Sequence, residues 1–235
     1  MPLAPPKREN LLLNIVCNIV VPSLVLTKLS TENRLGPMWG MLVALAFPLG
    51  YGVYDLVRRR KTNVFSIVGL CSVLLTGGFN YLKMDGLWFA IKEAAVPLLF
   101  AAAVLISNHT RRPLVREVLC NDQVMDMDRI DAALAEKGTR AAFDRLLINA
   151  SFAVAGSFVM SAALNYGLAR YLLQSPVGTP EFNAQLGRMN ALSWPVIVLP
   201  SMVVTMFIFW KLMGGITRLT GLGHEAIMRI EQPKK

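Results

Sequence analysis

Six long apolar stretches run through this chain of 235 residues and leave it few possible architectures. Five of them contain no charged residue: 10–27, 35–54, 62–82, 146–169 and 189–210. The remaining stretch, 87–108, is apolar except for Lys92 and Glu93. A helix of about 20 predominantly apolar residues crosses the hydrocarbon core of a bilayer. The stretches therefore predict an all-α, polytopic membrane protein with six transmembrane helices.

Composition excludes several other classes of protein. Hydrophobic residues make up 54% of the chain and charged residues 17%, whereas soluble domains average about a quarter charged. An ordinary soluble domain, a disordered chain and a coiled coil are therefore not expected. A transmembrane β-barrel would show alternating segments of about ten residues instead of continuous apolar runs. The cysteines, Cys17, Cys71 and Cys120, have no pairing pattern and are predicted to be reduced and structural.

The 24 basic residues predict how the chain is oriented. With a cytoplasmic N-terminus and six spans, eighteen of them fall in cytoplasmic segments and five in external ones, and Lys92 lies inside a span. Cytoplasmic loops collect lysine and arginine, so both termini are predicted to be cytoplasmic. The net charge of +9 follows the membrane edge and not a single surface, so nucleic acid is not an expected partner. The first apolar stretch is as long as a span, so we expect it to stay as a helix and not to be cleaved.

The predicted organisation is a transmembrane domain, residues 1–213, followed by a basic interfacial or cytoplasmic tail, residues 214–235. The spans are expected at about 10–29, 36–57, 62–82, 87–108, 145–173 and 189–213. Residues 111–144 are predicted to form a cytoplasmic amphipathic insertion. One short helix should follow Pro113, and a second should start near Asp126 or Asp128 and stop at Gly138.

The aspartates of this insertion resemble helix-capping groups more than metal ligands, because they lack the glycine and the terminal glutamate of a calcium loop. No metal site and no cofactor is predicted. The sequence also contains no HExxH, GxSxG or Walker A motif and no Cys/His cluster with metal-ligand spacing. We therefore predict that the chain is not an enzyme.

Polar side chains at membrane depth are costly, so they mark a candidate site. The first span carries Asn14 and Asn18 in its interior, the fifth span carries two asparagines, and the fourth span carries an adjacent lysine and glutamate. The hypothetical intramembrane polar pocket comprises Asn14, Asn18, Lys92, Glu93, Asn149 and Asn165. Hydrogen bonding between neighbouring helices is an equally open explanation for these groups. Glu93 is the sharpest functional candidate, because a carboxylate reaches the interface less easily than a lysine does.

Two fragments of the spans resemble each other. Asn18-x3-Pro22 and Glu93-x3-Pro97 lie in spans that cross the membrane in opposite directions. Opposed three-helix repeats with broken helices recur in transporters. A weak 3+3 inverted repeat therefore stays an open alternative to a chance similarity of two apolar segments.

The cytoplasmic side is rich in cations that can hold anionic lipid headgroups, each contributing about 1 kcal/mol near the surface. The hypothetical headgroup-binding residues are Arg58, Arg59, Arg60, Lys61, Arg111, Arg112 and Arg116. The lipid bilayer and its anionic lipids are therefore the expected partners.

The segment from 76 to 119 resembles the bacterial intracellular septation protein A family, also called YciB or IspZ. The residues that carry the resemblance are TGG (76–78), Asp85, Lys92, RRPL (111–114) and Leu119, together with Arg145-Leu146, Asn149, Phe152-Ala153-Val154 and Asn165 in the fifth span. The resemblance extends loosely over about 11–213. Residues 121–139 are an insertion relative to that family, and EAAVP (93–97) is not its sequence.

The whole chain is more similar to an uncharacterised sister family of six-helix inner-membrane proteins, through the motifs IKEAAVP (91–97), RIDAALAEKG (129–138) and FNAQLGRMNALS (182–193). The resemblance implies a multi-pass protein of the bacterial inner membrane, without enzymatic activity, that serves envelope maintenance or cell division through membrane partners or lipid. Membrane protein partners or a second copy of the chain are the expected proteins. The alternative is a small secondary transporter with a polar pocket at Asn14, Asn18, Glu93 and Asn149.

Overall fold

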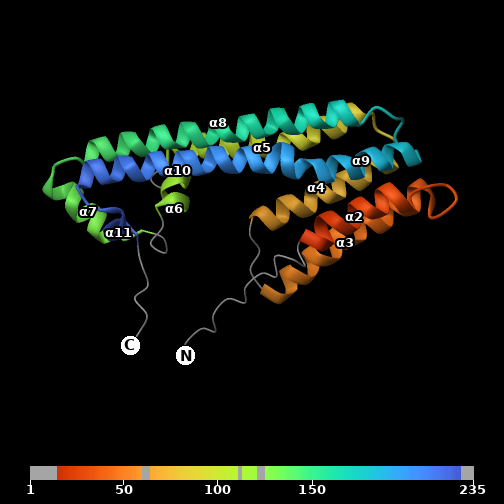
Figure 1. The fold of residues 1–235 in the computed structure, drawn as a ribbon, viewed down its shortest axis with the longest axis horizontal. Coiled ribbons are helices and arrows are strands. Elements are labelled where there is room, and N and C mark those ends of the chain that lie inside the picture. The colour runs from red at the N-terminus through yellow and green to blue at the C-terminus, as the bar shows by residue number, and fades with distance from the viewer. Residues whose placement is uncertain (1–14, 60–63, 111–112, 121–124, 229–235) are drawn as a thin grey trace. The chain divides into compact units, whose positions relative to one another are not determined.

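The structure is a computed structural model that describes residues 15–59, 64–110, 113–120 and 125–228 (Figure 1). Within these ranges the chain is helical between short turns and forms no β-strand; a single bridge pairs Met125 with Met228. Four helices of the described part are long and apolar enough to cross a membrane: Gly36–Val53, Gly86–Ser107, Arg140–Leu172 and Pro180–Thr220. The prediction of an all-helical polytopic membrane protein is confirmed at this level.

The chain divides into two compact units. Unit 1 comprises Met1–Val96 and Ala163–Val198, and unit 2 comprises Pro97–Ala162 and Leu199–Lys235.

Unit 1 begins its described part with an irregular helix from Val16 to Leu29. It consists of a π-helical turn η1 (Val16–Val20), a short α2 (Val21–Leu24) and a second π-helical segment η2 (Val25–Leu29). Pro22 has no N–H to donate, and its ring clashes with the carbonyl one turn earlier. Wider π turns on both sides accommodate this defect. This helix matches the predicted first span where the two overlap, and residues 10–14 of that span lie outside the described residues.

The next helices of unit 1 lie close to their predicted spans. They are α3 (Gly36–Arg59), α4 (Val64–Tyr81) and the first part of α5 (Gly86–Ser107). The end of α8 (Arg140–Leu172), α9 (Pro180–Ser193) and the π-helical η3 (Trp194–Val198) complete the unit. Phe89 forms edge-to-face contacts with Phe79 and Phe182, with ring centroids 5.7 and 5.0 Å apart, and these rings lie in the core of the unit.

Close packing of α9 against the first helix depends on a glycine. A Cβ on Gly187 would lie 2.9 Å from Thr27 Cγ2 and 3.0 Å from the Ser23 carbonyl oxygen. Small residues allow helix backbones to approach in a membrane, where apolar burial gives little drive for association. Asn190 adds a hydrogen bond of 3.2 Å from its Nδ2 to the Ser23 hydroxyl.

Unit 2 contains the short helices of the predicted insertion, α6 (Leu114–Leu119) and α7 (Met127–Glu136). Asp126 caps α7 by accepting from the Arg129 N–H at 3.2 Å, and Gly138 follows the helix with a φ of +63°. These boundaries confirm the predicted start near Asp126 and stop at Gly138. The remaining helices are α10 (Leu199–Thr220) and α11 (His224–Ile227), with parts of α5 and α8.

The core of unit 2 joins the insertion and the C-terminal segment to the long helices. Ile130, Leu134, Phe143 and Ile227 are all fully buried there. The Asp126 N–H donates to the Ile227 carbonyl at 2.8 Å.

Two helices extend beyond their predicted spans. α8 begins at Arg140 and takes up the last residues of the predicted insertion 111–144. The last span is one helix of 41 residues, Pro180–Thr220, in place of 189–213. It starts early because Thr179 accepts from the Phe182 N–H at 3.2 Å and Pro180 occupies the first turn. It ends late, so the tail predicted at 214–235 is helical through Gly214 and Gly215 to Thr220.

Candidate functional site

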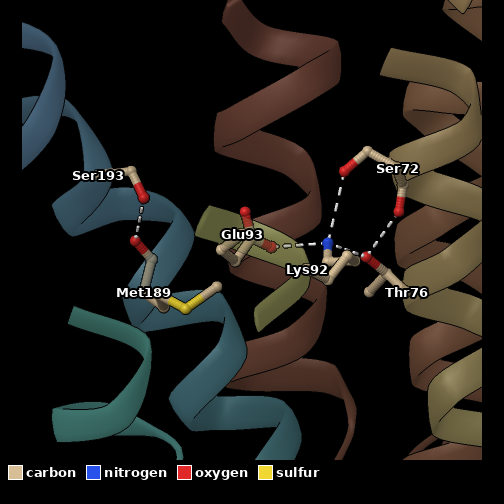
Figure 2. A network of polar contacts seen from close by, with 6 residues as sticks. All are labelled: Ser72, Thr76, Lys92, Glu93, Met189 and Ser193. Atoms are coloured by element: carbon tan, nitrogen blue, oxygen red, sulfur yellow. Dashed lines mark hydrogen bonds and ion pairs between the residues drawn. The ribbon is translucent and has the colours of Figure 1, made fainter. Parts of the chain in front are cut away.

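Lys92 on α5 is the centre of a polar network inside unit 1 (Figure 2). Its Nζ lies 2.7 Å from Glu93 Oε1, and its side chain is 5% exposed. It also donates to Thr76 Oγ1 at 2.7 Å and lies 3.4 Å from Ser72 Oγ. An ammonium group has three donors, so each donor of Lys92 has an oxygen partner.

The two hydroxyl partners are placed together by helix geometry. Ser72 and Thr76 are four residues apart on α4, so they share one face of that helix. The Thr76 hydroxyl donates to the Ser72 carbonyl at 2.9 Å, which fixes its lone pairs for the ammonium. The network therefore joins α4 to α5 by hydrogen bonds between side chains.

Glu93 lies on the other side of Lys92. Adjacent helix residues do not point the same way, and Figure 2 shows the Glu93 carboxylate between Lys92 and the α9 residues Met189 and Ser193. The Ser193 hydroxyl donates to the Met189 carbonyl at 2.8 Å within that helix. The Glu93 side chain is 25% exposed, so the carboxylate is the more accessible half of the pair.

The energetics favour keeping this pair intact. Removing one partner of a buried ion pair costs about 3–5 kcal/mol, since it leaves an uncompensated charge. Lys92 lies six residues after Gly86, which is about 9 Å along the helix axis. The arrangement can hold two helices together, and it can also present a carboxylate next to a fixed positive charge.

The other residues of the predicted pocket have different surroundings. Asn18 in η1 and Asn165 on α8 are half-buried in unit 1. Asn149 is exposed on the part of α8 that belongs to unit 2. Asn14 lies outside the described residues. The structure joins Lys92 and Glu93 directly, and a pocket shared by all six residues stays a prediction.

The predicted headgroup-binding residues are described only in part. Arg58 and Arg59 end α3. The lysine and the remaining arginines of the two clusters, at positions 60–61 and 111–112, lie outside the described residues. Arg116 is half-buried, and its Nη2 lies 3.7 Å from Asp131 Oδ2. Asp131 also pairs with Arg140, so this aspartate connects the insertion to the start of α8.

Three buried or half-buried polar groups were missed by sequence reasoning. Ser72 and Thr76 are ordinary hydroxyls in an apolar helix, and only their spacing of four residues could have signalled a shared partner. Asn183 is fully buried and donates from its Nδ2 to the Pro37 carbonyl at 2.6 Å. The polar sequence around it favoured an external loop.

Cys120 lies outside the membrane-spanning helices and is buried in the core of unit 2. Burial raises the pKa of its thiol to about 11, and the Arg116 guanidinium opposes this shift. The thiol therefore stays protonated at neutral pH. The described parts of the chain hold no group of three His, Cys, Asp or Glu residues that could bind a metal ion.

No known protein family, no curated protein and no solved structure matches this chain.

Proposed function

We propose that this chain is a multi-pass protein of the bacterial inner membrane that serves envelope maintenance or cell division by binding membrane partners or lipid, and that it does so without catalysis. The observation that carries this proposal is the closed network of Lys92, in which the charge at membrane depth is matched by Glu93, Ser72 and Thr76. A network that satisfies its own donors supports helix packing. The resemblance to septation protein A supplies the envelope role.

The proposal includes six spans with both termini in the cytoplasm. Exposed aromatic side chains support it: Trp39 near the start of α3, Tyr81 at the end of α4, Trp88 near the start of α5 and Tyr171 near the end of α8. Under six spans these four helix ends belong to the external side. Trp and Tyr gather at the membrane–water interface, so the four side chains fit one external aromatic belt.

Cysteine labelling tests this topology. In a variant with Cys17, Cys71 and Cys120 replaced by alanine, Lys83→Cys should react with a membrane-impermeant maleimide on intact spheroplasts. Glu136→Cys should react only after the membrane is permeabilised, because α7 is cytoplasmic in this proposal. Labelling of both sites from the same side would contradict six spans.

A second candidate function, a small secondary transporter, is favoured by the accessible carboxylate of Glu93 beside the buried Lys92. In such a carrier Glu93 would exchange its ion pair for a proton, and the hypothetical pocket of Asn14, Asn18 and Asn149 would hold the substrate.

One double variant separates the two functions. Lys92→Met with Glu93→Gln removes both charges and keeps the side-chain volumes, so it leaves no buried charge without a partner. A partner-binding protein with this change should still complement a deletion strain and keep its in-cell crosslinks. A proton-coupled carrier should lose both complementation and proton flux in vesicles, and that result would replace the first proposal by the second.

A further inference from the structure

Unit 2 has an apolar groove between α10 and the C-terminal segment around α11. Its volume is about 530 Å³. Five α10 residues between Thr205 and Met213 line one side, and His224 and Met228 line the other. The five recur with helical spacing, so they form one continuous face. Apart from Thr205 and His224 the lining is apolar.

The medium around this face is the first indication of what occupies the groove. α10 belongs to the 41-residue helix that is long and apolar enough to cross a membrane. In the proposed membrane location the apolar stretch up to Trp210 faces hydrocarbon, and Lys211 marks where the polar surface begins. Met206, Met213 and Met228 are unbranched and flexible, and such side chains adapt to irregular apolar ligands. An acyl chain is an apolar, flexible ligand of this kind.

A cation beside the turn that leads into α11 gives the second indication. Gly221 lies in the turn before α11 with a φ of +72°, and a Cβ there would lie 2.1 Å from Lys137 Nζ. The Lys137 ammonium therefore rests against the turn that leads to His224. No carboxylate in the described ranges forms an ion pair with Lys137.

We propose that this groove binds an anionic phospholipid, with one acyl chain between α10 and α11 and the headgroup next to Lys137 and His224. The charges complement each other, because the headgroup is negative where the protein is positive and the acyl chain is apolar where the groove is apolar. This inference rests on the membrane location proposed above, and it adds a defined lipid site on unit 2.

Trp210 lines the groove, so its fluorescence can report on the lipid. We would replace the other tryptophans, Trp39, Trp88 and Trp194, by phenylalanine in the full chain and place it in nanodiscs. Some of the phosphatidylcholine is then exchanged for brominated phosphatidylglycerol or brominated phosphatidylcholine, which quench tryptophan on contact. A cation near the membrane surface contributes about 1 kcal/mol, so brominated phosphatidylglycerol should occupy the site about fivefold more readily. A protein that keeps only Trp39, on α3, should show no such preference.

Two pairs of variants locate the site. Thr205→Phe fills the groove and should remove most of the preferential quenching, whereas Val203→Phe, exposed on the same helix outside the lining, should not. Lys137→Gln should remove the preference for phosphatidylglycerol, whereas Lys28→Gln in unit 1 should keep it.

Equal quenching of Trp210 by the two lipids would overturn the anionic headgroup site. A preference for brominated phosphatidylglycerol that survives Thr205→Phe would overturn the groove as its location. Neither result would alter the cysteine-labelling pattern or the crosslinks that test the proposed function. A failure of the labelling test would instead contradict the six-span topology of the proposed function and leave the lipid preference of Trp210 unaffected.

Discussion

Lys92 shows how a charged residue is tolerated inside an apolar helix. Its ammonium is nearly inaccessible, yet each donor has a partner, and the partners come from one neighbouring helix, α4, and from the adjacent residue on α5. The position of Lys92 and Glu93 at membrane depth was visible in the sequence. Their mutual pairing and the contribution of Ser72 and Thr76 were not, because these depend on which helix lies beside α5.

We expect Glu93→Gln to destabilise the protein more than the double variant Lys92→Met, Glu93→Gln. The single change leaves Lys92 buried without a counter-charge. For a fully buried pair this would lower the free energy of unfolding by about 3–5 kcal/mol. Because the Glu93 side chain is 25% exposed, we expect a smaller loss of about 2 kcal/mol. Thermal unfolding in detergent measures both variants. Asp144→Asn is the control, since its 3.8 Å pair with Arg140 is solvent-exposed and should contribute less than about 1 kcal/mol. A double variant that is no more stable than Glu93→Gln would contradict direct coupling.

Cys120 makes the stability of unit 2 sensitive to alkaline pH. Its pKa is about 11 in the folded protein and 9.0 for an ordinary thiol, so the unfolded chain loses the proton first as the pH rises. The contribution of the protonated thiol to the free energy of unfolding is therefore complete below pH 9. It is lost as the pH rises to 11, and the total loss is about 3 kcal/mol. Unfolding measured at pH 8 and pH 10.5 should show a smaller loss for Cys120→Ala than for the parent. Cys71→Ala, at an exposed site, should follow the parent; equal losses for all three proteins would contradict the assignment.

At the scale of helices, some helix ends could be predicted from the sequence and others could not. The capping residue Asp126 and the terminating Gly138 of α7 are local signals, and local signals can be identified from sequence. The cap Thr179 with Pro180 was also present in the sequence, but the last span was predicted to start only at residue 189, where the charge-free run begins, so the early start of α9 was missed. The π turns around Pro22 depend on how the backbone adjusts to a residue without an N–H donor. The spacing of apolar residues in the sequence does not reveal this adjustment.

Gly187 is the residue on which the approach of α9 to the first helix depends. We expect Gly187→Ala to lower the free energy of unfolding by about 1–3 kcal/mol, because the new methyl group overlaps Thr27 and the Ser23 carbonyl. Gly156→Ala is the matched control, since a Cβ there meets nothing within 4 Å and alanine is the better helix former by about 1 kcal/mol. Chemical denaturation in mixed micelles distinguishes them. A neutral or stabilising Gly187→Ala would contradict the close helix contact.

At the scale of the whole molecule, the long apolar stretches predicted an all-helical membrane protein, because only helices and closed barrels satisfy the backbone inside a bilayer and a barrel would show short alternating segments. The division into two units could not be predicted, since it depends on which distant segments share a core. The tail illustrates this difference. An interfacial or cytoplasmic tail was predicted from residue 214, yet α10 continues through Gly215, where a Cβ would lie 2.6 Å from Leu146 Cδ2, and Ile227 enters the core of unit 2.

The C-terminal segment should therefore stabilise the insertion. Ile227 is fully buried beside α7, and its carbonyl accepts the Asp126 N–H at the start of that helix. We expect Ile227→Ala to cost about 2–5 kcal/mol and to accelerate amide hydrogen exchange throughout α7. Met228→Ala is the control, because Met228 is 44% exposed and its truncation should leave the exchange of α7 nearly unchanged. Unchanged exchange in Ile227→Ala would mean that α7 is held by α8 and α10 alone. Faster exchange in α7 with unchanged exchange in unit 1 would show that the tail acts as part of unit 2.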